Sequence, residues 1–90
     1  MSKSLIEFKH WQDPTLEGEE EVFQDTLKIQ AANLSEAEFK ELRAELNAEK
    51  TCYVIDSMTG DSIEATYWGQ SYEKTQAEIT RLEGAGWTWT

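Results

Sequence analysis

Hydrophobic and polar side chains alternate most clearly over residues 22–32. Phe23, Leu27 and Ile29 fall on one face, with polar side chains between them, and only Asp25 interrupts that apolar face. Strict alternation over this length is typical of a β-strand with one buried face. The pattern therefore predicts a half-buried strand.

A helix is predicted to begin directly after Ser35. Ser35 followed three residues later by Glu38 has the form of a capping box, in which each residue satisfies the other's backbone N–H. Apolar residues then recur at helical spacing and form one stripe. The members of that stripe are Phe39, Leu42 and Leu46. The helix is expected to extend to residue 47 or 48.

Two further strand-like runs, 51–56 and 62–68, flank a short polar connection that contains Gly60. Runs separated by so short a glycine-containing segment predict an antiparallel hairpin. Cys52 lies in the first run, and we expect it to be a small buried apolar residue.

A second helix is predicted over residues 72–83, with Ser71 as its N-cap. Gly84 stands where a residue with positive φ stops a helix. The chain then ends in a strand-like alternation over residues 87–90, which places both of its tryptophans on one face.

From residue 22 onward the expected order is β-α-β-β-α-β. This order predicts an α+β fold with a ferredoxin-like antiparallel sheet and two helices on one face. We expect one domain over residues 1–90, because the chain is too short for two. Within it, residues 1–21 would form an N-terminal strand and an acidic loop, and 22–90 the βαββαβ core.

The N-terminal residues 5–11 also alternate and predict an edge strand or a cover for the sheet. In that alternation Ile6, Phe8 and His10 share one face and Leu5 takes the other. A turn at residues 13–15 and a polar acidic loop at 17–21 are expected to follow.

The net charge of the chain indicates which kinds of partner it can bind. Eighteen acidic and eight basic side chains leave a net charge of −10. This argues against direct nucleic-acid binding and against an anionic membrane, because both need clustered Lys and Arg. It favours a partner protein with a basic surface, such as a nucleic-acid-binding protein. The simpler explanation is that surface acid keeps a small protein in solution.

A reducing compartment suits the chain, because a single cysteine, Cys52, allows no intrachain disulfide. No signal-like segment or apolar run of membrane-spanning length is visible. We expect a cytoplasmic protein.

The first predicted helix carries a stripe of glutamates. At about 100° per residue, four glutamates spaced three and four apart fall on one narrow strip of the helix surface. They are Glu38, Glu41, Glu45 and Glu49. Such a row could imitate a nucleic-acid backbone and dock into a basic groove. The alternative is a solvated helix face in a glutamate-rich protein.

Three tryptophans form a second candidate surface: Trp68, Trp87 and Trp89. Tryptophan is enriched at interaction hot spots, so an exposed aromatic sheet face would serve self-association or docking. The alternative is that the two C-terminal tryptophans belong to the core, because a small domain needs its largest apolar residues inside.

Catalysis and metal binding find little support in the residue pattern. His10 is the only histidine, and no partner that could orient it is apparent in the sequence. No glycine-rich phosphate loop is present, and one His with one Cys cannot form an ordinary zinc site. We expect a non-enzymatic protein with no cofactor and no metal.

Three hypotheses follow. The first is an acidic interaction module that binds and blocks a basic protein. In size and charge the chain resembles the small inhibitors that mobile elements deploy against host nucleic-acid machinery, including DNA mimics and anti-CRISPR proteins. That resemblance is one of composition and covers no motif. The second hypothesis is an assembly module that homodimerises or docks through the tryptophan face. The third, a small ligand-binding domain or enzyme, would need a pocket with convergent polar groups.

Overall fold

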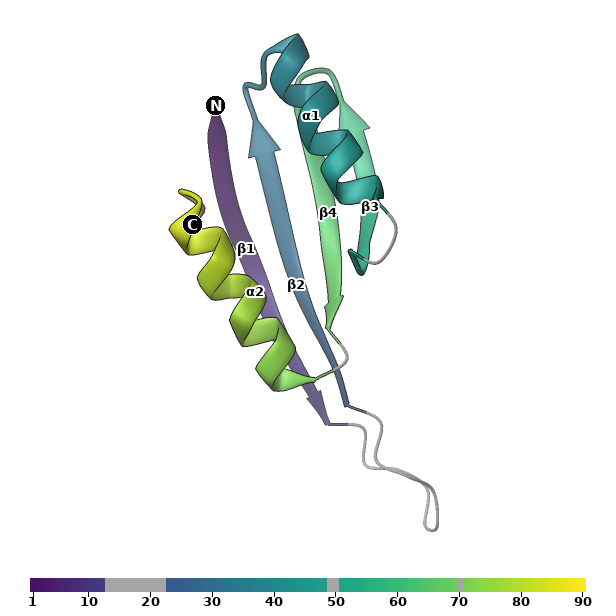
Figure 1. Ribbon diagram of the computed structural model, residues 1–90, viewed down its shortest axis with the longest axis vertical. Coiled ribbons are helices and arrows are strands. Elements are labelled where there is room, and N and C mark those ends of the chain that lie inside the picture. The colour runs from purple at the N-terminus through teal and green to yellow at the C-terminus, as the bar shows by residue number, and fades with distance from the viewer. Residues whose placement is uncertain (13–22, 49–50, 70) are drawn as a thin grey trace.

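A computed structural model describes residues 1–12, 23–48, 51–69 and 71–90. It is an α+β structure, a mixed five-stranded sheet with two helices on one face (Figure 1). In chain order the elements are β1 (Ser2–Gln12), β2 (Phe23–Ala32), α1 (Glu36–Asn47), β3 (Tyr53–Thr59), β4 (Ser62–Gly69), α2 (Tyr72–Gly84) and β5 (Thr88–Trp89). The turn expected at 13–15 and the acidic loop expected at 17–21 lie outside the described residues.

The strands lie in the order β3-β4-β2-β1-β5. Neighbours are antiparallel except β1 and β5, which are parallel. The α+β class is confirmed, but the strand order differs from the predicted ferredoxin-like one, in which the last strand lies beside the first strand of the βαββαβ series. Here β1 occupies that place and is an interior strand, neither an edge strand nor a cover. Consecutive strands commonly pair, and β1 offers β2 a far longer hydrogen-bonding partner than the two-residue β5 does.

A β-bulge in β1 decides which side chains enter the core. Leu5 lies opposite Ile29 of β2 and Phe8 lies opposite Leu27, with a register shift after Leu5. Because the bulge inserts one extra residue, Leu5 and Phe8 both face the helices although three positions separate them. Ile6 is the residue left exposed. The prediction that Ile6 shares a strand face with Phe8 and that Leu5 lies on the other face was therefore wrong.

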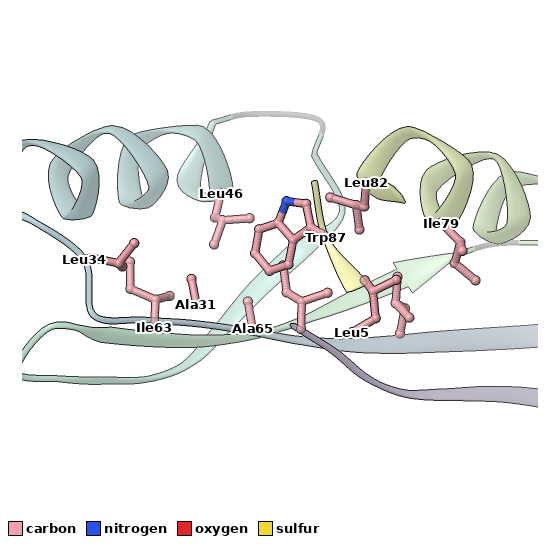
Figure 2. Close-up of a cluster of buried hydrophobic side chains, with 11 residues drawn as sticks. Leu5, Ala31, Leu34, Leu46, Ile63, Ala65, Ile79, Leu82 and Trp87 are labelled. Carbon is pink, nitrogen blue, oxygen red and sulfur yellow. The ribbon is translucent and has the colours of Figure 1, made fainter. Parts of the chain in front are cut away.

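The hydrophobic core lies between the sheet and the two helices. Its centre is Trp87, which fills the space between Leu46 of α1 and Leu82 of α2 above the sheet (Figure 2). The predicted core face of β2 is confirmed, since Leu27 and Ile29 are both buried. Burying a Leu or Ile side chain completely contributes about 1.5–3 kcal/mol to the stability of the folded state.

The predicted start of α1 is confirmed in detail. The backbone N–H of Glu38 donates to Ser35 Oγ (3.2 Å), and the backbone N–H of Ser35 donates to Glu38 Oε1 (2.9 Å). Leu34 is buried and Phe39 packs against the same cluster. The capping box therefore fixes both where α1 begins and how its apolar stripe meets the sheet.

Helix α2 ends one residue later than predicted, and the residue with positive φ comes two residues later. Gly84 is the last helical residue, and it is Gly86 that has positive φ (97°). The N–H of Gly86 donates to the carbonyl of Glu83 (3.2 Å), and that of Trp87 donates to Leu82 (3.0 Å). These two bonds are a Schellman motif, whose usual apolar contact is the one between Leu82 and Trp87.

The hairpin is tighter than predicted, because β3 continues to Thr59 and the turn is only Gly60 and Asp61. Cys52, expected to be buried, is exposed. Its φ of 61° is left-handed, and its carbonyl accepts a hydrogen bond from the Trp68 N–H (2.8 Å). Cys52 therefore turns the chain directly before β3 begins, and its side chain lies outside the core.

Candidate functional site

The structure describes three of the four glutamates in the predicted stripe. Glu41 and Glu45 lie one helical turn apart on α1 and are exposed, while Glu38 is partly buried. Glu49 lies outside the described residues. Glu41 and Glu45 thus form the described, solvent-facing part of the stripe.

Glu38 has a structural role within that stripe. Its carboxylate accepts a hydrogen bond from the Ser35 backbone N–H, and this bond, with a smaller contribution from the Ser35 side chain, lowers the pKa of Glu38. A carboxylate held at a helix N-terminus also faces the positive end of the helix dipole. Its charge is therefore already used in starting α1.

A groove of about 340 Å³ lies beside Glu45, between the two helices and the β3–β4 hairpin. Its lining combines carboxylate, guanidinium, phenol and apolar groups. The lining residues are Glu45, Leu46, Thr51, Tyr53, Tyr67, Glu78 and Arg81. We call it the interhelix groove. Sequence reasoning missed it, because its charged members belong to different helices. They come together only when both helices pack on the same face of the sheet.

Glu78 is the centre of the polar network in the interhelix groove. Arg81 donates to it twice, from Nε to Oε1 (2.5 Å) and from Nη2 to Oε2 (2.8 Å). The Tyr53 hydroxyl donates to Glu78 Oε2 (2.5 Å). Arg81 Nη1 also lies 3.8 Å from Glu45 Oε1, which links α2 to the glutamate stripe of α1. The groove and the stripe therefore share Glu45.

The network holds its members in fixed protonation states. Burial opposes the ionisation of Glu78, but the hydrogen bonds from Arg81 and Tyr53 outweigh it, so its pKa lies below the ordinary value. Burial and the neighbouring Glu78 carboxylate raise the pKa of Tyr53. The bond to Glu78 raises the pKa of Arg81. At neutral pH the network thus consists of the Glu78 carboxylate, the Arg81 guanidinium and the neutral phenol of Tyr53.

The three candidate tryptophans do not form one surface. Trp87 is 5% exposed and belongs to the core. Trp68 is about half exposed and pairs in register with Thr26, on the sheet face opposite the helices. Trp89 is also about half exposed but pairs with Leu5 at the β5 edge. Only Trp68 therefore lies on the uncovered face of the sheet.

His10 has an orienting partner that sequence reasoning did not find. It lies directly opposite Asp25 in the β1–β2 ladder, and its Nδ1 is 2.7 Å from Asp25 Oδ1. Asp25 is completely buried, whereas the His10 side chain is 45% exposed. The ring of Tyr72 packs edge-on against the imidazole at 5.3 Å. The available signal was Asp25 itself, a carboxylate on an otherwise apolar strand face.

Paired in this way, a buried carboxylate holds an imidazole in one orientation, which is one part of many acid–base sites. A nucleophile or substrate pocket would have to be added before the pair defined a reaction. Among the described residues, no group of three or more His, Cys, Asp or Glu side chains is placed to hold a metal ion. Over the same ranges, no helix is long and apolar enough to cross a lipid bilayer.

Comparison of the chain with protein-family models, with curated proteins and with solved structures found no match. A function for the chain therefore has to follow from the geometry of the described residues.

Proposed function

We propose that this is a small acidic, non-enzymatic interaction protein that binds a basic surface on a partner protein. The observation that carries the proposal is the exposed pair Glu41 and Glu45 on α1, beside the interhelix groove. Like charges at i,i+4 repel by a few tenths of a kcal/mol, and a basic partner would relieve that repulsion. The contact would lie on the outer side of α1.

Net charge supports the same function at longer range. A chain with net charge −10 attracts cationic surfaces and accelerates their association at low ionic strength. The specific form that we propose is a nucleic-acid mimic, an inhibitor of the kind that phages and mobile elements use against host nucleic-acid-binding proteins, as anti-CRISPR proteins do. Such a protein would act in the cytoplasm and would not itself bind nucleic acid.

The test compares two double variants with equal charge changes. Glu41→Gln with Glu45→Gln removes the proposed contact, whereas Glu73→Gln with Glu83→Gln removes two exposed charges from α2. Immobilised proteins are incubated with nuclease-treated lysate at low and high salt. We expect the wild type and the α2 variant to retain a basic protein at low salt, and the α1 variant to lose it. Duplex DNA should compete the partner off. Equal retention by both variants would contradict the proposal.

A second candidate is an assembly module, favoured by apolar side chains on and beside the edge strand β3. Val54 and Met58 are 52% and 48% exposed, and Trp68 of the adjacent β4 is also exposed. An unpaired strand edge is a common site of self-association. This function predicts a molar mass, measured by light scattering, that rises with concentration and is insensitive to salt. Trp68→Ala should abolish the rise, and an unchanged monomer at all concentrations would rule this function out.

A further inference from the structure

We propose that the interhelix groove is a socket for an arginine side chain of the partner protein. The inference deepens the proposed function and rests on it for the source of that arginine. Its basis is the chemistry of the groove itself, which places an available carboxylate, two aromatic rings and an apolar side chain around one opening.

Glu45 supplies the acceptor for the entering side chain. Glu78 already accepts two hydrogen bonds from Arg81 and one from Tyr53. Glu45 Oε1 lies 3.8 Å from Arg81 Nη1, which is beyond hydrogen-bond distance, and its side chain is 58% exposed. A carboxylate has about four acceptor positions, so Glu45 retains the capacity to bind a guanidinium.

The wall of the groove suits a guanidinium better than an ammonium ion. Tyr53 and Tyr67 lie with their ring centroids 5.1 Å apart and their planes at 55°, and Leu46 adds apolar surface beside them. A guanidinium is planar, weakly hydrated and stacks on aromatic rings, whereas the lysine ammonium is compact and strongly hydrated. The same walls would therefore favour arginine over lysine.

The charges of the groove also favour a cationic side chain as its occupant. At neutral pH, Glu45 and Glu78 carry two negative charges and Arg81 carries one positive charge, so the groove holds one negative charge that is not compensated within it. Arg81 also demonstrates that a guanidinium fits against these carboxylates, since it binds Glu78 through two parallel bonds. One further cation from a partner would neutralise the groove.

A peptide titration tests the socket without the partner. The ¹⁵N-labelled full chain is titrated with acetyl-Gly-Arg-Gly-amide and with its lysine and citrulline counterparts. We expect saturable shifts, centred on the amides of Tyr53, Tyr67 and Glu78, with a dissociation constant of about a millimolar or weaker. The lysine peptide should bind several-fold more weakly and the citrulline peptide should not saturate. Shifts scattered over the surface, or equal for arginine and citrulline, would overturn the socket.

Variants add a second, independent readout. Glu45→Gln should weaken binding of the arginine peptide by up to about five-fold, the range of an exposed ion pair. Tyr67→Leu should weaken it by about two-fold to five-fold, the range of an exposed cation–π contact. Glu83→Gln, an equal charge change on the outer side of α2, should leave it unchanged. If Glu45→Gln and Glu83→Gln weakened peptide binding equally, the peptide would be responding to the net charge of the protein, and the socket would fail.

The experiment separates the socket from the proposed function. If Glu41→Gln weakens capture of a basic partner while the arginine peptide does not saturate, the acidic contact stands and the socket fails. If the peptide saturates at the interhelix groove while partner capture is insensitive to Glu41, the socket stands and the proposed contact through α1 fails.

Discussion

His10 Nδ1 lies 2.7 Å from Asp25 Oδ1, and the two residues stand directly opposite each other on β1 and β2. Asp25 is fully buried, and its second carboxylate oxygen, Oδ2, has no hydrogen-bond partner among the described residues. Over the described part of the chain, the imidazole is therefore the hydrogen-bond partner of this buried carboxylate. The pair links the stability of the β1–β2 ladder to a single histidine.

Removing His10 is expected to destabilise the fold. Since the buried Asp25 carboxylate would lose its partner, His10→Ala should lower the free energy of unfolding by about 1–3 kcal/mol. Replacing both residues, as in His10→Phe with Asp25→Leu, should cost less than His10→Ala alone, because no buried charge is then left unpaired. Urea denaturation measures both, with the exposed Glu83→Gln as a control. A double variant less stable than His10→Ala would contradict this account.

The Glu78 network makes stability depend on pH. The folded-state pKa of Glu78 is below its ordinary value of 4.5, so its contribution is present above about pH 4.5 and is lost as the pH falls through the folded pKa. Glu78→Gln should therefore reduce the slope of unfolding free energy against pH in this acidic range. Urea titrations from about pH 6 down to about pH 3 measure the slope. An unchanged slope would show that Glu78 has the same pKa in the folded and unfolded chains.

The tryptophans are expected to divide into one core residue and two surface residues. Trp87→Ala should lower the free energy of unfolding by about 3–5 kcal/mol, because it leaves a cavity between Leu46 and Leu82. Trp68→Ala and Trp89→Ala should each cost far less, since both side chains are about half exposed. Thermal denaturation followed by circular dichroism ranks the three. A cost at Trp68 as large as that at Trp87 would place Trp68 in a buried contact.

Gly69 is the position where α2 approaches the sheet most closely among the described glycines. A Cβ at residue 69 would lie 1.9 Å from Thr75 Oγ1, and Thr75 is fully buried. Gly69→Ala should therefore destabilise the protein by about 1–3 kcal/mol, as overpacking does. Combining it with Thr75→Ala should recover part of that cost, beyond the sum of the single changes.

Gly84 provides the matched control for that prediction. It lies within α2, and a Cβ there would have no atom within 4 Å. Gly84→Ala should stabilise the protein by about 0.4–1 kcal/mol, because it restricts the unfolded chain without strain in the folded one. If both glycine substitutions changed the melting temperature in the same direction, close approach at Gly69 would not be the cause.

Local patterns in the sequence determined the helices, the hairpin and the core face of β2. Ser35 and Glu38 form the predicted capping box because both partners lie within one turn, so that no distant residue is needed. Alternation in β2 was equally informative, because successive side chains point to opposite faces along a strand that has no bulge of its own. Such signals depend only on residues that are close together in the chain, so they can be interpreted without knowing the tertiary structure.

Tertiary structure alone decided the pairings. The place of β1 between β2 and β5, and the bulge that turns Leu5 into the core, depend on hydrogen bonds between strands distant in sequence. The exposed Cys52 depends on a carbonyl held by the Trp68 N–H. None of these has a periodic signature in the residues themselves.

The candidate sites divide in the same way. Glu41 and Glu45 could be assigned to one helix surface from their spacing, since helix geometry alone places them there. The interhelix groove could not, because Glu45 and Arg81 are brought within 3.8 Å only when α1 and α2 lie on the same face of the sheet. The sequence by itself determined a half-buried strand, two capped helices and an acidic surface. Only the fold decided which of those charges meet, since contacts between distant residues are set by packing rather than by local periodicity.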